Sequence, residues 1–163
     1  MNVWYLHGLE SSQGGPKVDF LNEVADEVFA PEMDYSRVDL FPELVKKAQA
    51  ERPDLIIGSS MGGYYADAIG SHTGIEVLLF NPALHSRSIE KILKYGEENW
   101  KRHFVVGEDD DVINPQMTEV LVDISESFEV IKGMGHRTTL DVFKAIYIKL
   151  FVNEAKWYYF RAR

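Results

Sequence analysis

The stretch DLIIGSSMGGYY, residues 54–65, decides the fold class of this 163-residue chain. Its apolar run at 55–57 is continuous rather than alternating, as in strands buried on both faces of a parallel sheet. A glycine stands two residues before and two residues after Ser60, and residues 61–71 favour a helix. The stretch therefore predicts a buried strand, a sharp turn at Ser60 and a helix.

The same alternation of short apolar segments and helical spacing continues along the chain. The predicted strands are residues 3–6, 27–30, 54–58, 76–80, 101–106 and 127–131, and the predicted helices are residues 17–26, 39–51, 61–71, 88–99, 115–122 and 138–151. Such alternation predicts a three-layer α/β/α sandwich with a mostly parallel sheet of about six strands. We expect a single domain over residues 1–163.

Composition excludes several classes of function. The 26 acidic and 17 basic residues give a net charge of −9, which disfavours binding to nucleic acid and to anionic membranes. The chain has no cysteine, which excludes disulfides, thiolate metal sites and a cysteine nucleophile. The amino terminus lacks a signal-peptide pattern, and no apolar run reaches the length of a membrane helix. We expect a cytoplasmic protein.

The segment GSSMG at 58–62 matches the Gly-x-Ser-x-Gly pattern of a nucleophile elbow, in which a serine sits on a tight turn between a strand and a helix. The flanking glycines allow the neighbouring backbone to approach closely. An alternative is a glycine-rich turn that binds a nucleotide phosphate. Neither a Lys-Ser/Thr pair nor a dinucleotide fingerprint accompanies the turn, so we predict Ser60 as a nucleophile.

A serine hydroxyl needs a neighbouring base, and after this motif the chain order is an acid followed by a histidine. The histidines beyond Ser60 are His72, His85, His103 and His136. His136 follows the last predicted strand and so falls at the carboxyl edge of the sheet, where ligands bind. His72 and His103 fall away from that edge, whereas His85 could line the pocket. We predict His136 as the base, with a surface loop histidine as the alternative.

The acid is expected after the preceding strand, where residues 107–115 read GEDDDVINP. Hydrolase loops of this kind often read Gly-x-x-Asp-x-Val-hydrophobic-x-Pro, a register that selects Asp110. Asp109 and Asp111 remain alternatives, and the cluster has a second interpretation as a solvated acidic turn or a metal site. The EF-hand calcium pattern is absent, and we predict no metal.

The tetrahedral intermediate of acyl transfer requires backbone donors. The Met61 N–H, at the start of the helix, is one predicted donor, and the Leu9 N–H is the other. Gly8 allows the turn of the loop that carries Leu9, and His7 is expected to brace that loop.

The segments YLHG (5–8), SS (11–12), GSSMGGYYA (58–66), NPA (81–83) and GMGH (133–136) resemble the YqiA-type small bacterial esterases of the α/β-hydrolase superfamily. The resemblance implies a minimal α/β-hydrolase fold, a Ser60–Asp110–His136 triad, no cofactor, and action on short- to medium-chain acyl esters. One departure is Leu9-Glu10, where those esterases have Phe-Asn. Glu10 brings a negative charge near the predicted oxyanion loop.

Three alternatives remain: an acyl-CoA thioesterase or a peptidase on the same residues, and a non-catalytic interaction protein of this fold. The expected partner is a small acyl ester, and the expected state is a monomer or homodimer. Because the segments between strands are short, only residues 81–100 could cover the site, so we expect an open pocket without a large lid. The aromatic segment 157–160 either packs on the body or forms a dimer contact.

Overall fold

The computed structural model describes residues 1–85, 100–121 and 127–152. In chain order the elements are β1 (Asn2–Leu6), α1 (Pro16–Val24), β2 (Glu27–Phe29), α2 (Leu40–Glu51), β3 (Leu55–Ser59), α3 (Met61–Thr73), β4 (Val77–Phe80), β5 (Arg102–Gly107), α4 (Pro115–Leu121), β6 (Ser127–Ile131) and α5 (Leu140–Phe151). The predicted helix 88–99, most of the segment 81–100 and the aromatic segment 157–160 lie outside the described residues. Among the described helices, none combines the length and the apolar composition that a bilayer crossing requires.

The strands form one parallel sheet in the order β2-β1-β3-β4-β5-β6, which confirms the predicted α/β architecture. The chain leaves β1 for β2 on one side and returns to place β3 on the other side of β1. The carboxyl ends of β1 and β3 therefore flank a topological switch point, where open α/β sheets bind ligands. Leu6 pairs with Gly58 there, so the loop after β1 faces the turn after β3.

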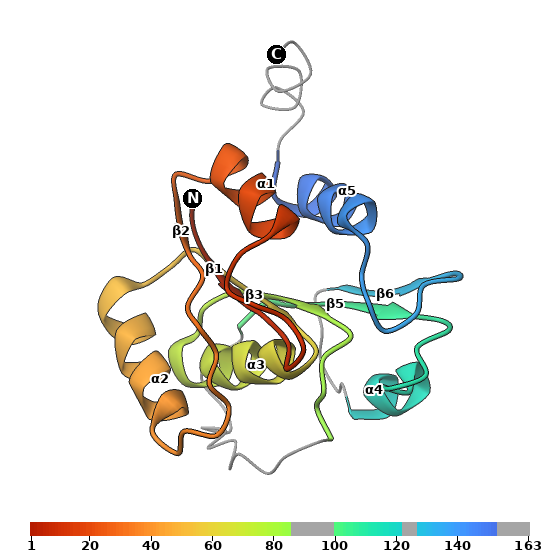
Figure 1. The fold of residues 1–163 in the computed structure, drawn as a ribbon, viewed down its shortest axis with the longest axis horizontal. Helices are drawn as coiled ribbons and strands as arrows, with labels where there is room; N and C mark the ends of the chain where they lie inside the picture. The colour runs from red at the N-terminus through yellow and green to blue at the C-terminus, as the bar shows by residue number, and fades with distance from the viewer. Residues whose placement is uncertain (86–99, 122–126, 153–163) are drawn as a thin grey trace.

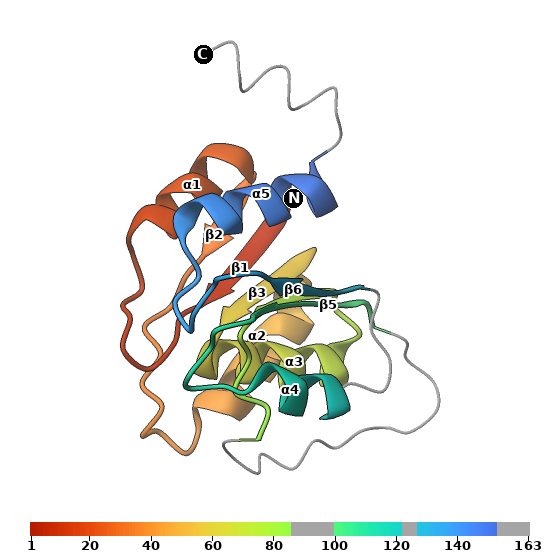
Figure 2. The same cartoon turned by 90° about the vertical axis from the view of Figure 1, so that its right-hand side faces the viewer.

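Helices cover both faces of the sheet, as the continuous apolar strands require. Figures 1 and 2 show α1 and α5 on one face, and α2 and α3 on the other. Alternate strand residues point to opposite faces. Trp4, Leu6 and Ile56 pack in the core beside α2 and α3, whereas Tyr5 and Ile57 pack in the core beside α1 and α5.

The predicted boundaries are correct to within a few residues, and the differences have local causes. The predicted helix from residue 138 begins at Leu140, because Thr139 has extended backbone and its hydroxyl accepts a 3.3 Å hydrogen bond from the Val142 N–H. The predicted helix to residue 26 ends at Val24, because Ala25 adopts extended backbone just before β2.

Candidate active site

Ser60 sits on a strained turn between β3 and α3. Its backbone has φ 54° and ψ −117°, in the region that residues other than glycine rarely adopt. Its N–H donates to the Phe80 carbonyl oxygen at 2.9 Å, and its own carbonyl oxygen accepts from the Ala83 N–H at 3.0 Å. Backbone bonds to the end of β4 thus hold the strained turn in place.

Steric crowding requires glycine at the positions two residues before and two residues after Ser60. A Cβ atom at Gly58 would lie 2.3 Å from the Gly62 carbonyl oxygen, and a Cβ at Gly62 would lie 2.0 Å from the Leu6 carbonyl oxygen. Real Cβ atoms do not approach backbone this closely. The close approach of β1, β3 and α3 therefore depends on the two glycines that the sequence pattern supplies.

The side chains of Ser60, His136 and Asp110 meet at the carboxyl edge of the sheet. His136 Nε2 lies 3.0 Å from Ser60 Oγ, and His136 Nδ1 lies 2.9 Å from Asp110 Oδ2. The Asp110 side chain is fully buried, whereas the His136 side chain keeps 21% of its surface exposed. With Nδ1 donating to the carboxylate, Nε2 is left to accept the serine proton.

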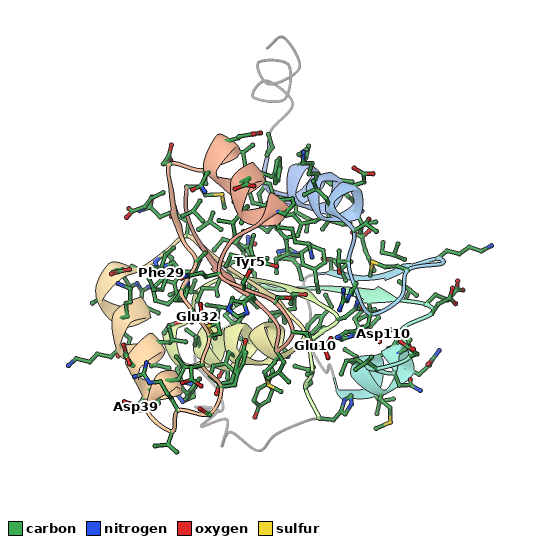
Figure 3. The ribbon with its side chains drawn as sticks, in the orientation of Figure 1. Tyr5, Glu10, Phe29, Glu32, Asp39 and Asp110 are labelled. Atoms are coloured by element: carbon green, nitrogen blue, oxygen red, sulfur yellow. The ribbon has the colours of Figure 1, made fainter. Side chains whose placement is uncertain are left out.

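The acidic loop presents one of its three aspartates to the imidazole. Asp110 Oδ1 accepts hydrogen bonds from the N–H groups of Val112 at 2.9 Å and Ile113 at 2.8 Å. These bonds fix the carboxylate below His136, and the neighbouring Asp109 and Asp111 are exposed. Figure 3 shows Asp110 in the loop between β5 and α4, at the same end of the sheet as Glu10.

Asn81, the residue directly after β4, ties the histidine loop to the sheet. Its side-chain N–H₂ donates to the carbonyl oxygens of Gly135 at 3.2 Å and His136 at 2.7 Å. Its side-chain oxygen accepts from the Gly107 N–H at 2.7 Å, and its backbone has a positive φ of 43°. Asn81 belongs to the NPA segment quoted from the sequence, but its hold on the loop of His136 was not predicted, although its place at a buried strand end was a usable signal.

The predicted oxyanion donors flank Ser60. Met61 is the first residue of α3, and Leu9 lies in the loop after β1. Within the described parts of the chain, neither backbone N–H has an acceptor. A Cβ at Gly8 would lie 3.2 Å from Ser60 Cβ, so the loop passes very close to the serine.

His7 lies where it can brace the loop after β1. Its Nδ1 is 2.8 Å from the Gly8 carbonyl oxygen, and the Met33 N–H donates to its Nε2 at 3.1 Å. The Tyr35 hydroxyl donates to the His7 carbonyl oxygen. Both ring nitrogens of His7 are thus engaged with backbone groups.

The other histidines lie away from Ser60. His103 bridges Glu76 and Ser127 at the amino ends of the strands, with both contacts at 2.8 Å. His72 bonds to the Ala68 carbonyl oxygen of its own helix. His85 is exposed and is not among the described residues that line the cavity beside Ser60.

A cavity of about 370 Å³ opens beside the serine, within the size range of small-ligand sites. Its lining residues are Tyr5, Gly8, Leu9, Glu10, Ser11, Lys17, Ser59, Ser60, Val112, His136, Arg137 and Thr138. The rim is apolar in part, because Leu9 and Val112 are 58% and 62% exposed. In the described residues, no three histidine or carboxylate side chains are placed to share a metal ion.

Solved structures with this fold include several hydrolases. A monoacylglycerol lipase from Paleococcus ferrophilus superposes with a TM-score of 0.69 at 15% identity, over 89% of this chain and 91% of that chain. A variant of SOBER1 from Arabidopsis thaliana also gives 0.69, at 16% identity over 91% and 97%. A putative hydrolase of the alpha/beta superfamily from Xanthomonas campestris gives 0.64, at 20% identity over 91% and 98%. These likenesses establish the α/β-hydrolase fold.

Sequence relatives point to one family. UPF0227 protein VP0969 from Vibrio parahaemolyticus is 36% identical over 94 residues, which are 51% of this chain and 51% of that protein. The matched region thus spans about half the length of that relative. Residues 2–141 match the family described as "Uncharacterised protein family (UPF0227)". Because this match covers most of the chain, the chain belongs to the UPF0227 family, and it has the α/β-hydrolase fold.

Proposed function

We propose that this protein is a serine esterase that cleaves short- to medium-chain carboxylic esters through an acyl-enzyme. The observation that carries the proposal is the contact series from Ser60 Oγ to His136 Nε2 at 3.0 Å and from His136 Nδ1 to Asp110 at 2.9 Å. A strained elbow and an adjoining cavity support it, because both are needed for attack on a bound ester.

In the proposed mechanism, His136 Nε2 removes the hydroxyl proton as Ser60 Oγ attacks the ester carbonyl carbon. Asp110 holds the imidazole in the required tautomer and stabilises the imidazolium that forms. His136 then returns the proton to the departing alcohol oxygen, which leaves an acyl group on Ser60. A water molecule, deprotonated by His136, attacks the acyl carbonyl and releases the carboxylic acid and free serine.

The negative charge of the tetrahedral intermediate falls on the former carbonyl oxygen. In this proposal the N–H groups of Met61 and Leu9 donate to that oxygen. Two features support the assignment: both groups lack an acceptor in the described structure, and Gly8 brings the loop of Leu9 against Ser60. Removal of one such donor in other hydrolases lowers kcat by about 100- to 1,000-fold.

The size of the cavity favours small substrates. About 370 Å³ accommodates a short or medium acyl chain, and the exposed side chains of Leu9 and Val112 offer apolar contact at the rim. The Paleococcus ferrophilus protein with this fold is named a monoacylglycerol lipase, which is consistent with acyl-ester chemistry. An acyl thioester would use the same steps with a thiol as the leaving group.

The experiment is labelling with a fluorophosphonate probe, combined with hydrolysis of p-nitrophenyl esters of two to ten acyl carbons. We expect the wild-type protein to be labelled and to be most active on the shorter esters, and Ser60→Ala and His136→Ala to lose both properties. A matched control is Ser127→Ala, because Ser127 also contacts a histidine, His103, at 2.8 Å but lies outside the cavity.

Ser127→Ala should retain labelling and hydrolysis. A wild-type protein that neither reacts with the probe nor hydrolyses any ester would instead support the non-catalytic interaction protein. Labelling that persists in Ser60→Ala would also contradict the proposal.

A further inference from the structure

Lys17, the second residue of α1, places a positive charge in the cavity beside Ser60. Its side chain is half-buried and lines the same cavity as Ser60 and His136. Its Nζ lies 5.6 Å from the centre of the Phe143 ring. Within residues 1–85, 100–121 and 127–152 it makes no ion pair or hydrogen bond, so its charge has no anionic partner there.

Tyr5 and Thr138 contribute two hydroxyl groups to the lining of the same cavity. The Tyr5 and Phe143 rings pack edge to face, with their centres 5.9 Å apart, and the Tyr5 hydroxyl bonds to none of the described residues. The Thr138 hydroxyl is buried and has no hydrogen-bond partner in the described structure. Buried hydroxyls normally find a partner, so the cavity lining has spare hydrogen-bonding capacity.

The charge balance of the cavity is opposite to that of the chain. The whole sequence carries −9, yet the lining residues that the structure describes include Lys17 and Arg137 against one carboxylate, Glu10. Arg137 and Glu10 pair with each other at 3.4 Å on the rim, where both side chains are 86% exposed. Among the described lining residues, Lys17 therefore remains as the charge without a partner of opposite sign.

An unpaired ammonium group in a partly buried site destabilises the fold unless a ligand neutralises it. Burial lowers the pKa of Lys17, which is the expected response to that desolvation. Phe143, the ring beneath Lys17, belongs to the core beside α1 and α5. A bound anion accounts for the lysine, the Tyr5 hydroxyl and the position of both beside the nucleophile.

We propose that Lys17 and Tyr5 form an anion-binding subsite, and that the substrates are esters bearing a carboxylate or phosphate on the acyl or the alcohol part. The inference rests on the proposed esterase function and specifies its substrate class. The ammonium of Lys17 pairs with the anion, the Tyr5 hydroxyl donates a hydrogen bond to it, and the ester carbonyl lies at Ser60.

The test compares esters that differ in one charge. p-Nitrophenyl pentanoate and the p-nitrophenyl monoester of glutaric acid have acyl chains of equal length, and phenyl acetate and 3-acetoxybenzoate differ by a carboxylate on the alcohol part. The quantity measured is the ratio of kcat/KM for the anionic ester to that for the neutral ester, after subtraction of the rate with Ser60→Ala protein.

Three proteins are compared: wild type, Lys17→Met and Lys144→Met. Lys144 is the matched control, because it is also a half-buried lysine over an aromatic ring, 5.2 Å from the centre of Phe20, but it lies outside the cavity. We expect Lys17→Met to lower the ratio at least tenfold for one of the two pairs, and Lys144→Met to leave both ratios within twofold. Ratios for Lys17→Met within twofold of wild type for both pairs would overturn the inference.

A binding measurement separates this inference from the proposed function. Monomethyl glutarate is titrated calorimetrically into Ser60→Ala protein and into the Ser60→Ala/Lys17→Met double variant. Binding to the first that weakens at least tenfold in the second supports the subsite, even if the wild type hydrolyses no ester. Equal binding to both, or binding to neither, overturns the subsite, even if the wild type is an active esterase.

Discussion

The Asn81 side-chain amide donates a 2.7 Å hydrogen bond to the main-chain carbonyl oxygen of His136. The same side chain accepts a 2.7 Å bond from the Gly107 N–H, at the end of β5. One asparagine thus connects the ends of two strands to the loop that carries the proposed base. The rigid sheet, rather than the loop alone, sets the position of the imidazole relative to Ser60.

Asn81→Asp tests this positioning. Aspartate has the same size and tolerates the positive φ of 43°, but it places a carboxylate oxygen against the two carbonyl oxygens that the amide now binds. We expect the His136 loop to shift and the acylation rate to fall about 100-fold, the scale of effect that small misplacements have. Rapid-mixing measurement of the p-nitrophenolate burst gives that rate.

A positioning role predicts a lower kcat with little change in KM, together with slower labelling by the fluorophosphonate probe. A variant that loses thermal stability but keeps the wild-type acylation rate at a temperature where it is folded would show that Asn81 serves the fold alone.

Asp110→Asn should lower kcat by about 10,000-fold, because an amide favours the tautomer of His136 with the wrong nitrogen protonated. The control variants are Asp109→Asn and Asp111→Asn, whose side chains are exposed. Each of these should retain kcat within about threefold, in agreement with the small effect expected of surface charges. Steady-state hydrolysis of one p-nitrophenyl ester compares all three. A loss of activity in Asp109→Asn or Asp111→Asn equal to that of Asp110→Asn would contradict the assignment.

The fold was predictable because its signals are local. The continuous apolar strand at β3 and the glycines on either side of Ser60 identify a parallel sheet and a strand-turn-helix. The chain order of the strands then places residues 110 and 136 at the same edge as Ser60, since the carboxyl ends of parallel strands lie together.

The residues of the proposed anion-binding subsite were not predictable in the same way. Lys17 reads in the sequence as the first turn of an amphipathic helix, and Tyr5 reads as one apolar residue of a buried strand. Their meeting at the Phe143 ring depends on how α1 and α5 pack over the sheet, which no local pattern encodes. The choice among Asp109, Asp110 and Asp111 was undecided for a related reason. Only Asp110 is buried, and that difference arises from the tertiary structure.

Gly62→Ala tests the steric account of the elbow. The added Cβ would lie 2.0 Å from the Leu6 carbonyl oxygen, so α3 and β1 must move apart. We expect a loss of about 3 kcal/mol or more in the free energy of unfolding, at the upper end of overpacking effects. Gly14→Ala is the control, because a Cβ there meets no atom within 4 Å. Urea denaturation followed by tryptophan fluorescence measures both, and equal stability of the two variants would show that the contact relaxes without strain.

Lys17→Met should make the protein more stable at pH 7, with the gain shrinking as the pH rises. Burial lowers the pKa of Lys17 below its ordinary value of 10.5, so the charged ammonium destabilises the folded state. That destabilisation is fully present below the folded-state pKa. It fades between the folded-state and unfolded-state pKa values, where the folded protein releases the proton that the unfolded chain still binds. Methionine retains the apolar stem without the charge.

The measurement is the urea midpoint of wild type, Lys17→Met and Lys144→Met at pH 7 and pH 9.5. Tyr5 stays neutral over this range, because burial raises its pKa to about 12. The other ionisable residues that line the cavity, Glu10, His136 and Arg137, are present in all three proteins, so their contributions cancel in the comparison. Lys144→Met controls for removing a positive charge from a chain of net charge −9. A Lys17→Met protein less stable than wild type at pH 7, by more than the control, would mean that the lysine supports the fold. We expect Lys17→Met to be more stable than wild type and to hydrolyse anionic esters more slowly. That combination would mean that the wild-type protein keeps a charge that disfavours folding because the charge binds the ligand.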